Sequence, residues 1–208
     1  MYKLVIFDFD GTLADSARWL AREINPLAAR FGFRRVTEAE IEVLRGRDTR
    51  GVLDALGVAQ WKLPFIARHL RRRMTEDAET IQLFPGAKAL LRRLAGQGVV
   101  LGVVSSNSAE NVRRVLGPEA AALVEHYACG ASLFGKARQF RKLVRRARVK
   151  PCETLCIGDE TRDIEAARAA GLASGAVAWG YACREVLAER APTWFFETPD
   201  EVAERLAA

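Results

Sequence analysis

Cysteine and histidine are scarce in this chain of 208 residues, which contains four cysteines and two histidines. The cysteines form no Cys-x-x-Cys pair; they are Cys129, Cys152, Cys156 and Cys183. Structural zinc sites need closely grouped ligands, and disulfide-stapled folds need many paired cysteines. The sequence therefore predicts neither a zinc site nor a disulfide framework, and we expect reduced thiols in the core or near the surface.

Long apolar runs are also absent. No stretch approaches the roughly 20 apolar residues that span a bilayer, and residues 1 to 7 are too short, and too quickly followed by acids, for a signal peptide. Half of the residues are hydrophobic, which is enough for one substantial core and a small second module. We therefore expect a globular cytoplasmic enzyme without a membrane partner, either a monomer or a homodimer.

Acidic residues are outnumbered by basic ones, which gives a formal net charge of +6. Residues 68 to 73 and 141 to 150 are rich in arginine, so a nucleic-acid-binding module is an alternative function from a different class. Apolar residues such as Phe140 and Leu143 recur among the arginines at helical spacing. We therefore interpret both segments as solvated helix faces and expect no nucleic-acid partner. An electropositive surface would also favour encounter with a small phosphorylated metabolite.

One segment carries the strongest functional signal. Residues 4 to 7 form an apolar run, which is followed by Asp8 and Asp10 and then by Gly11 and Thr12. Such a run is typical of a strand buried on both faces of a parallel sheet, and the carboxyl ends of parallel strands line the ligand crevice. The two carboxylates are therefore candidates for chemistry, and Gly11 and Thr12 supply a turn whose backbone N–H groups can approach an anion.

This Asp-x-Asp-Gly-Thr pattern resembles motif I of the haloacid dehalogenase (HAD) superfamily, and the chain is similar to its phosphoglycolate phosphatase branch. The resemblance implies that Asp8 is the nucleophile and a metal ligand. It also implies that Asp10 is the general acid/base and binds the metal through its backbone carbonyl. Gly11 then lies in the implied phosphate-binding loop.

A second strand-like run, residues 101 to 104, ends in a Ser-Ser-Asn-Ser sequence. It resembles motif II of the superfamily, which implies a phosphate-binding hydroxyl; Ser105 aligns best, and Ser106 is the alternative. A hydroxyl and the backbone N–H groups that follow it can donate to a phosphate without adding charge. The same residues would also suit the N-cap of a helix from residue 109 onward.

Lys136 follows Gly135 at the start of an apolar-periodic helix, where the helix dipole disfavours a cation. An anion should therefore lie beside it. The position resembles that of the motif III lysine, which implies that Lys136 bridges the nucleophilic carboxylate and the substrate phosphate. Arg138 competes for this role, and a solvated lysine is the other alternative.

A third apolar run, residues 155 to 157, leads to Asp159, Glu160 and Asp163. Carboxylates gathered at neighbouring strand ends repel one another unless a cation lies between them, and Mg²⁺ prefers such oxygen ligands. The segment resembles motif IV, which implies that Asp159 binds Mg²⁺ and that Asp163 either binds it or supports a ligand. Glu160 is a further candidate ligand, or only a first-turn helix acid.

Residues 15 to 83 differ from the rest of the chain, because apolar residues recur there every three or four positions. We expect four helices, at about residues 15 to 32, 37 to 45, 48 to 57 and 60 to 77. A capping box from Thr37 to Glu40 should open the second helix. Beyond about residue 84, strands near 99 to 104, 125 to 129, 153 to 157, 174 to 178 and 193 to 196 alternate with helices, as in a parallel sheet covered on both faces.

The predicted fold class is therefore α/β, a HAD-like three-layer doubly wound parallel sheet with an inserted small α-helical cap. The core domain should comprise residues 1 to 14 and 84 to 208, and the cap domain residues 15 to 83. An insertion directly after the loop of the first strand is placed above the crevice. We therefore expect the cap to act as a lid.

The resemblance implies a Mg²⁺-dependent phosphatase that hydrolyses a small phosphomonoester through a covalent aspartyl-phosphate intermediate. A β-phosphoglucomutase-like phosphomutase would share every core residue and is the alternative. A haloalkanoate dehalogenase lacks the second motif I aspartate, so Asp10 argues against it. A phosphonatase uses a cap lysine, and Lys62 is the cap's only lysine, which makes that activity a weak alternative.

Residues 45 to 50 of the cap form a glycine-containing loop between two expected helices. Gly46 permits a tight turn, and Asp48 or Thr49 can cap the helix that follows. If the lid closes over the crevice, Arg47 or Arg50 could offer a bidentate fork to a carboxylate or second phosphate at the non-reacting end of the substrate. The alternative is that both arginines are solvated near helix ends.

Overall fold

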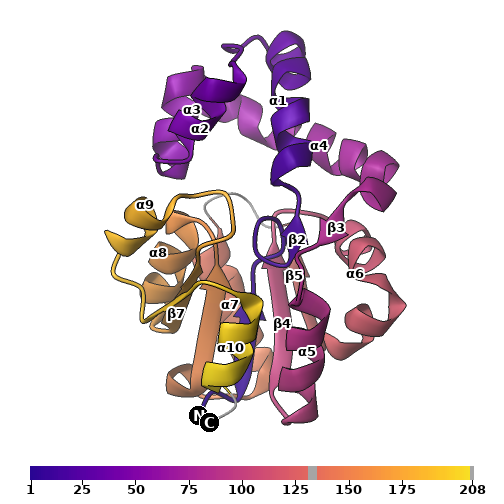
Figure 1. The fold of residues 1–208 in the computed structure, drawn as a ribbon, viewed down its shortest axis with the longest axis vertical. Coiled ribbons are helices and arrows are strands. Elements are labelled where there is room, and N and C mark those ends of the chain that lie inside the picture. The colour runs from indigo at the N-terminus through magenta and orange to yellow at the C-terminus, as the bar shows by residue number, and fades with distance from the viewer. Residues whose placement is uncertain (131–134, 207–208) are drawn as a thin grey trace.

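The computed structural model describes residues 1–130 and 135–206, and its centre is a sheet of six parallel strands (Figure 1). The strands lie in the order β5-β4-β1-β6-β7-β8. Their bounds are His126–Cys129 (β5), Val100–Ser105 (β4), Leu4–Phe7 (β1), Thr154–Gly158 (β6), Ala173–Val177 (β7) and Trp194–Phe196 (β8). Every neighbouring pair is parallel, which confirms the sheet expected from the alternation of strands and helices.

Strand β1 lies in the middle of this sheet, between β4 and β6. Side chains alternate between the two faces of a strand. Accordingly, Val5 and Phe7 belong to one core cluster, and Leu4 and Ile6 belong to another. A strand that is buried on both faces can present polar groups only at its ends, and Asp8 follows at the carboxyl end.

Helices cover both faces of the sheet (Figure 1). Three of them, α5 (Ala87–Gly96), α6 (Ala109–Leu123) and α10 (Pro199–Leu206), contribute to the cluster that contains Val5 and Phe7. Two others, α7 (Lys136–Ala147) and α8 (Thr161–Ala170), contribute to the cluster that contains Leu4 and Ile6. The short helix α9 (Arg184–Ala188) and the 3₁₀ turn η3 (Pro151–Glu153) lie in the connections. The three-layer α/β architecture is therefore confirmed.

Helix α7 illustrates how the basic segments are accommodated. Phe140 and Leu143 are buried against the sheet, whereas Arg141 and Arg145 are exposed. The basic side chains thus occupy the solvent face of an amphipathic helix, as expected. Among the described residues, no helix combines the length and the apolar character needed to cross a membrane.

Four helices are inserted between residues 15 and 82, after β1 and before α5. They are α1 (Ala17–Phe31), α2 (Glu38–Leu44), α3 (Thr49–Leu56) and α4 (Leu63–Asp77), with the 3₁₀ turns η1 (Gln60–Lys62) and η2 (Ala78–Thr80). All four helices expected from the apolar periodicity are present. The predicted capping box is also confirmed: the Thr37 N–H donates to Glu40 at 2.8 Å, and the Glu40 N–H donates to the Thr37 hydroxyl at 3.3 Å.

This helical insertion has a small apolar cluster of its own, built from Val36, Leu44, Leu56 and Val58. Figure 1 shows its helices beyond the carboxyl ends of the sheet strands. The insertion is therefore placed where a lid would need to be. The exact division of the chain into a core domain and a cap domain stays a prediction.

A two-stranded antiparallel ribbon joins the insertion to the sheet. Its strands are β2 (Ala14–Asp15) and β3 (Gln82–Leu83), and the Phe84 N–H extends the pairing by donating to the Leu13 carbonyl at 2.9 Å. The ribbon was not predicted, because two residues per strand give no alternation that a sequence pattern could reveal. Both connections to the insertion therefore run side by side.

Candidate active site

Three carboxylates that are distant in the sequence meet at the carboxyl edge of the sheet. Asp8 follows β1, Asp159 follows β6, and Asp163 lies in the first turn of α8. Oxygen atoms of the three side chains lie within 4.8 Å of one another, and all three residues are buried. Adjacent parallel strands end at the same edge of a sheet, so the neighbouring positions of β1 and β6 bring Asp8 and Asp159 together.

Lys136 is the first residue of α7 and reaches into this cluster. Its Nζ lies 2.6 Å from Asp8 Oδ2 and also pairs with Asp163 Oδ1, and the residue is only 2% exposed. The two carboxylates compensate a cation that the helix dipole would disfavour. The structure therefore brings Lys136 together with the acids, whereas Arg138 is exposed on the same helix.

Burial dominates the electrostatics of this cluster. It raises the pKa of Asp8 to about 7, although Lys136 opposes the shift, and it raises the pKa of Asp159 well above its ordinary value. Burial would lower the pKa of Lys136, but Asp163 and Asp8 outweigh it and raise that pKa. Three carboxylates around one ammonium leave an excess of negative charge. An oxygen-rich, negatively charged pocket of this kind fits a small hard divalent cation.

Both oxygens of Asp159 are held by neighbouring groups. The Thr12 hydroxyl donates to Oδ1 at 2.7 Å, and the Tyr181 N–H donates to Oδ2 at 2.8 Å. Gly11 has a φ of +81°, and a Cβ there would lie 2.1 Å from Asp159 Oδ2. Only glycine can therefore occupy this turn without displacing the carboxylate.

Asp10 occupies a different environment from the three clustered acids. Its Oδ1 accepts from the Ser16 hydroxyl at 3.0 Å, and its Oδ2 accepts from Asn107 Nδ2 at 3.3 Å and from the Ser105 hydroxyl at 3.4 Å. Burial raises the pKa of Asp10, and the bonds from Ser16 and Asn107 oppose that rise. Among the described residues, no hydrogen-bond partner of Asp10 carries a charge.

Ser105 and Ser106 differ in their burial and in their hydrogen-bond partners. Ser105 is buried and its hydroxyl also accepts from the Asn107 N–H at 3.0 Å, so it belongs to the network around Asp10. Ser106 is half-buried, and its backbone carbonyl accepts from Arg71 of α4 at 3.1 Å. The expected N-cap is formed by Ser108, whose hydroxyl accepts from the Asn111 N–H at 3.1 Å.

Glu160 lies outside the cluster of three acids. It is the N-cap residue of α8, and its backbone N–H donates to Asp163 at 3.2 Å. Its side chain pairs with Arg162 and accepts from the Thr49 hydroxyl of the insertion at 2.9 Å. Burial opposes ionisation of Glu160, but the attraction of Arg162 outweighs burial and lowers the pKa of that carboxyl. Glu160 therefore stands at the helix start, which fits the second of its two expected roles, and whether it also binds a metal stays a prediction.

Residues 5–177 match the family of haloacid dehalogenase-like hydrolases. This chain belongs to that family. Its resemblance to the phosphoglycolate phosphatase branch is also confirmed by curated relatives. Phosphoglycolate phosphatase of Synechococcus elongatus is 34% identical over 95% of this chain and 94% of that protein. Phosphoglycolate phosphatase of Xanthomonas campestris is 33% identical over 86% of this chain and 84% of that protein.

The fold of this hydrolase is likewise confirmed by solved structures. The crystal structure of a predicted phosphatase from Clostridium acetobutylicum superposes with a TM-score of 0.83 at 20% identity, and the match covers 100% of this chain and 99% of that one. At this level of identity the likeness concerns the fold alone.

The loop at residues 45 to 50 of the insertion touches the core of the hydrolase. Arg45 Nε donates to the Tyr181 carbonyl at 3.0 Å, and Asp48 lies 3.4 Å from Arg190. Arg47 and Arg50 are exposed. Contacts of this loop with the core are thus made by Arg45, Asp48 and Thr49, which reaches Glu160. The contact of Arg45 was not expected from the sequence, and the expected role of Arg47 or Arg50 toward the substrate stays a prediction.

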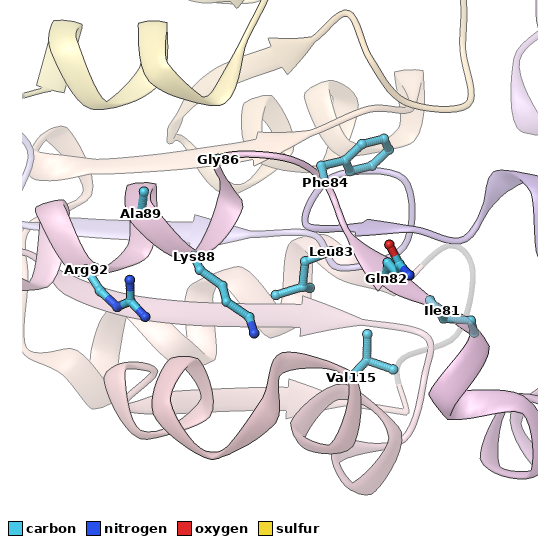
Figure 2. A pocket seen from close by; sticks show the side chains of 9 residues that line it. All are labelled: Ile81, Gln82, Leu83, Phe84, Gly86, Lys88, Ala89, Arg92 and Val115. Atoms are coloured by element: carbon cyan, nitrogen blue, oxygen red, sulfur yellow. The ribbon is translucent and has the colours of Figure 1, made fainter.

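A cavity of about 540 Å³ lies elsewhere, beside β3 and α5. Figure 2 shows the side chains that line it, which are Ile81, Gln82, Leu83, Phe84, Gly86, Lys88, Ala89, Arg92 and Val115. None of these nine residues has a carboxylate, a thiol or an imidazole. We therefore place the chemistry of the hydrolase at the buried acids and not in this cavity.

Proposed function

We propose that this hydrolase is a Mg²⁺-dependent phosphatase that hydrolyses a small phosphomonoester, with phosphoglycolate as the first candidate, through a covalent aspartyl-phosphate intermediate. The observation that carries the proposal is the buried cluster of Asp8, Asp159 and Asp163 around Lys136. The curated relatives named phosphoglycolate phosphatase support the choice of substrate.

Asp8 is the proposed nucleophile. It stands at the end of the central strand, and its Oδ2 lies 2.6 Å from Lys136 Nζ. The ammonium favours the ionised form of Asp8 against the effect of burial, and it can neutralise oxygens of the phosphoryl group as charge develops on them. Attack by Asp8 on phosphorus forms the aspartyl phosphate and breaks the bond to the leaving oxygen, with Lys136 in contact with both the nucleophile and the transferred group.

Asp10 is the proposed general acid and base. It must protonate the leaving alcohol and later accept a proton from the water that hydrolyses the aspartyl phosphate. A carboxyl held only by neutral donors such as Ser16, Ser105 and Asn107 can change its ionisation state more easily than Asp8, which is ion-paired. The environments of Asp8 and Asp10 therefore suit two different roles.

A divalent metal ion would be held by Asp8, Asp159 and the backbone carbonyl of Asp10, with Asp163 either a ligand or a support for Lys136. The oxygen donor set and the excess negative charge of the buried acids fit Mg²⁺. When bound, Mg²⁺ would supply Lewis-acid stabilisation to the phosphoryl oxygens. Thr12 and Tyr181 would keep Asp159 oriented for that purpose.

The remaining predicted residues would bind the rest of the substrate. We assign phosphate binding to the Ser105 hydroxyl and to the backbone of Gly11 and Ser106, together with Lys136. The helical insertion, residues 15 to 83, would act as the lid, which agrees with its place beyond the strand ends (Figure 1). Arg47 and Arg50 remain the proposed contacts of the lid with the distal carboxylate of the substrate.

The test is a phosphatase assay on the purified protein with phosphoglycolate and a panel of other small phosphomonoesters. We expect phosphate release with Mg²⁺, none in chelator, and none from Asp8→Asn, whose amide cannot attack phosphorus. Asp54→Asn is the matched control, because Asp54 is exposed on α3 in the insertion. Full activity in chelator, or an active Asp8→Asn variant free of deamidated protein, would contradict the proposal.

A further inference from the structure

Tyr181 joins three parts of the molecule through three different atoms. Its N–H donates to Asp159 Oδ2 at 2.8 Å, and its hydroxyl lies 2.8 Å from the Ser16 hydroxyl. Its carbonyl accepts from Arg45 Nε at 3.0 Å. One residue of the loop after β7 thus touches an acid of the cluster, the start of α1 and the end of α2.

Ser16 is placed unusually for a residue at the start of a helix. It is the N-cap of α1, where a serine side chain ordinarily accepts a hydrogen bond from the first turn. Within the described part of the chain its hydroxyl makes no such bond. The hydroxyl is fully buried and instead lies 3.0 Å from Asp10 Oδ1 and 2.8 Å from Tyr181 Oη. The Ser16 hydroxyl therefore contacts Asp10 and does not cap the helix.

The direction of these two hydrogen bonds follows from the chemistry of the groups. An ionised carboxylate only accepts, so while Asp10 is ionised Ser16 must donate its single proton to Asp10 Oδ1. The Ser16 oxygen is then free to accept, and Tyr181 must be the donor to it. Tyr181 therefore fixes the orientation of the Ser16 hydroxyl, and through it one oxygen of Asp10.

The helical insertion supplies both remaining contacts of this chain of hydrogen bonds. Ser16 directly precedes α1, and Arg45 directly follows α2. Arg45 also donates from Nη2 to the Gly180 carbonyl at 3.3 Å, and its own carbonyl accepts from the Cys183 N–H at 3.0 Å. Residues 180 to 183 are therefore held by Arg45 from the insertion side.

We propose that Tyr181 is a positioning residue for Asp10, acting through Ser16, and that Arg45 makes this positioning depend on the docking of the helical insertion against the core. The inference rests on the proposed function, since it takes Asp10 to be the general acid and base. Protonation of the leaving oxygen is then best aligned when the insertion contacts residues 180 to 183. Neither residue needs to touch the substrate.

Tyr181→Phe tests the first step, because phenylalanine keeps the ring and the N–H to Asp159 and removes only the hydroxyl. We expect the single-turnover rate of phosphoryl transfer from an alkyl phosphomonoester to fall roughly 3- to 10-fold, the range for loss of one neutral hydrogen bond. The single-turnover rate of phosphoryl transfer from an activated aryl phosphate, whose leaving group needs little protonation, should change little. KM and the Mg²⁺ concentration for half-maximal activity should stay the same. Equal losses for the two substrates would overturn the positioning role.

Tyr2→Phe is the matched control for this substitution. The Tyr2 hydroxyl accepts from Trp194 Nε1 at 2.9 Å, and Tyr2 precedes β1 at the end of the strand opposite Asp8. The control variant therefore loses a tyrosine hydroxyl and a hydrogen bond far from the acids. It should retain wild-type rates with both substrates.

A double-mutant cycle identifies the group through which Tyr181 acts. In an Asp10→Asn background, Tyr181→Phe should cause no further loss, since its effect requires the carboxylate. A full additional loss would show that Tyr181 acts on another group and would overturn the inference. If Asp10→Asn alone treats alkyl and aryl substrates equally, the acid/base role of Asp10 fails instead, whatever Tyr181 does.

Arg45→Met tests the coupling to the insertion. We expect Arg45→Met to slow alkyl substrates more than aryl substrates, as Tyr181→Phe does. In the variant that carries both substitutions, the fold-loss in rate should be smaller than the product of the two single fold-losses. Arg34→Met is the control, because the partners of Arg34, Glu40 and the Ala55 carbonyl, both lie within the insertion. A double variant whose fold-loss equals the product of the two single fold-losses would contradict the coupling. An Arg45→Met variant with wild-type rates would also contradict it.

Discussion

Lys136→Met should destabilise the metal-free protein strongly, and by more at alkaline than at acidic pH. Lys136 is only 2% exposed and is ion-paired with Asp8 and Asp163. Methionine fills a similar volume without the charge, so the substitution leaves two buried carboxylates without their cation. Breaking a buried pair by removing one partner typically costs about 3–5 kcal/mol of stability, and we expect this loss at about pH 8.5.

The pH dependence follows from the raised pKa of Asp8. Burial raises it to about 7 while Lys136 lowers it, so removal of Lys136 raises it further. A carboxyl with a raised folded-state pKa holds its proton more tightly in the folded protein. Its contribution to stability is therefore fully present below the unfolded pKa and is lost as pH rises through the folded pKa. At about pH 5.5, below the folded-state pKa, Asp8 is mostly protonated with or without Lys136. The loss of stability in the variant at about pH 5.5 should therefore be less than about half of its loss at about pH 8.5.

Denaturant unfolding in chelator at both pH values measures the effect, and an unchanged m-value would show that the unfolded state is comparable. Lys88→Met is the matched control, because Lys88 is exposed in the first turn of α5. It should change stability by no more than about 0.5 kcal/mol. A Lys136→Met loss that is equal at both pH values, or larger at the acidic one, would show that lost packing, and not the unpaired charge of Asp8, destabilises the variant.

Further predictions concern catalysis, metal binding and substrate recognition. Asp10→Asn should lower kcat for alkyl phosphomonoesters roughly 10²- to 10⁴-fold, and in the first half-reaction an aryl phosphate should be less affected; equal losses in the single-turnover phosphorylation rate for both substrates would speak against a general acid. Asp159→Ala should sharply raise the Mg²⁺ concentration needed for activity, as a metal titration would measure, and an unchanged titration would remove Asp159 as a ligand. Arg47→Met or Arg50→Met should raise KM for phosphoglycolate by roughly 10-fold, the equivalent of one charge-assisted contact. The KM of an aryl phosphate without a distal anion should not change, and a similar rise for both substrates would place specificity elsewhere.

The positions of Asp8 and Asp159 could be predicted because each follows a strand with a strong local signal. Residues 4 to 7, 101 to 104 and 155 to 157 are apolar runs that end in polar residues, and in a parallel sheet such ends must meet at one edge. Helix starts were equally readable, as the capping box at Thr37 shows. A strand end or a helix start can thus be predicted from a few neighbouring residues of the sequence.

The contacts of Tyr181 and Arg45 could not be predicted in this way. Tyr181 and Ser16 are separated by 165 positions in the sequence, and their hydroxyl contact leaves no periodic trace. A serine before a helix predicts an N-cap, whereas the structure turns the Ser16 hydroxyl toward Asp10. Such hydrogen bonds depend on how the insertion docks on the core, which is set by tertiary packing.

The roles of Arg45 and Arg47 show the same limit within one loop. Both are arginines that follow α2, and nothing in their local sequence distinguishes them. The structure places the Arg45 side chain on the carbonyls of Gly180 and Tyr181 and leaves Arg47 exposed. The contact of Arg45 with the core therefore could be seen only in the fold, whereas the proposed contact of Arg47 or Arg50 with the substrate stays a prediction.

The central claim is that Asp8 carries the phosphoryl group during turnover. The most direct measurement mixes the Mg²⁺-loaded protein with phosphate-labelled phosphoglycolate, quenches within the first turnover with acid, and locates the label by peptide mass spectrometry. We expect a transient label on Asp8, absent from Asp8→Asn, which decays as free phosphate appears. Release of phosphate in the first turnover with no labelled residue, or with the label on another residue, would contradict it.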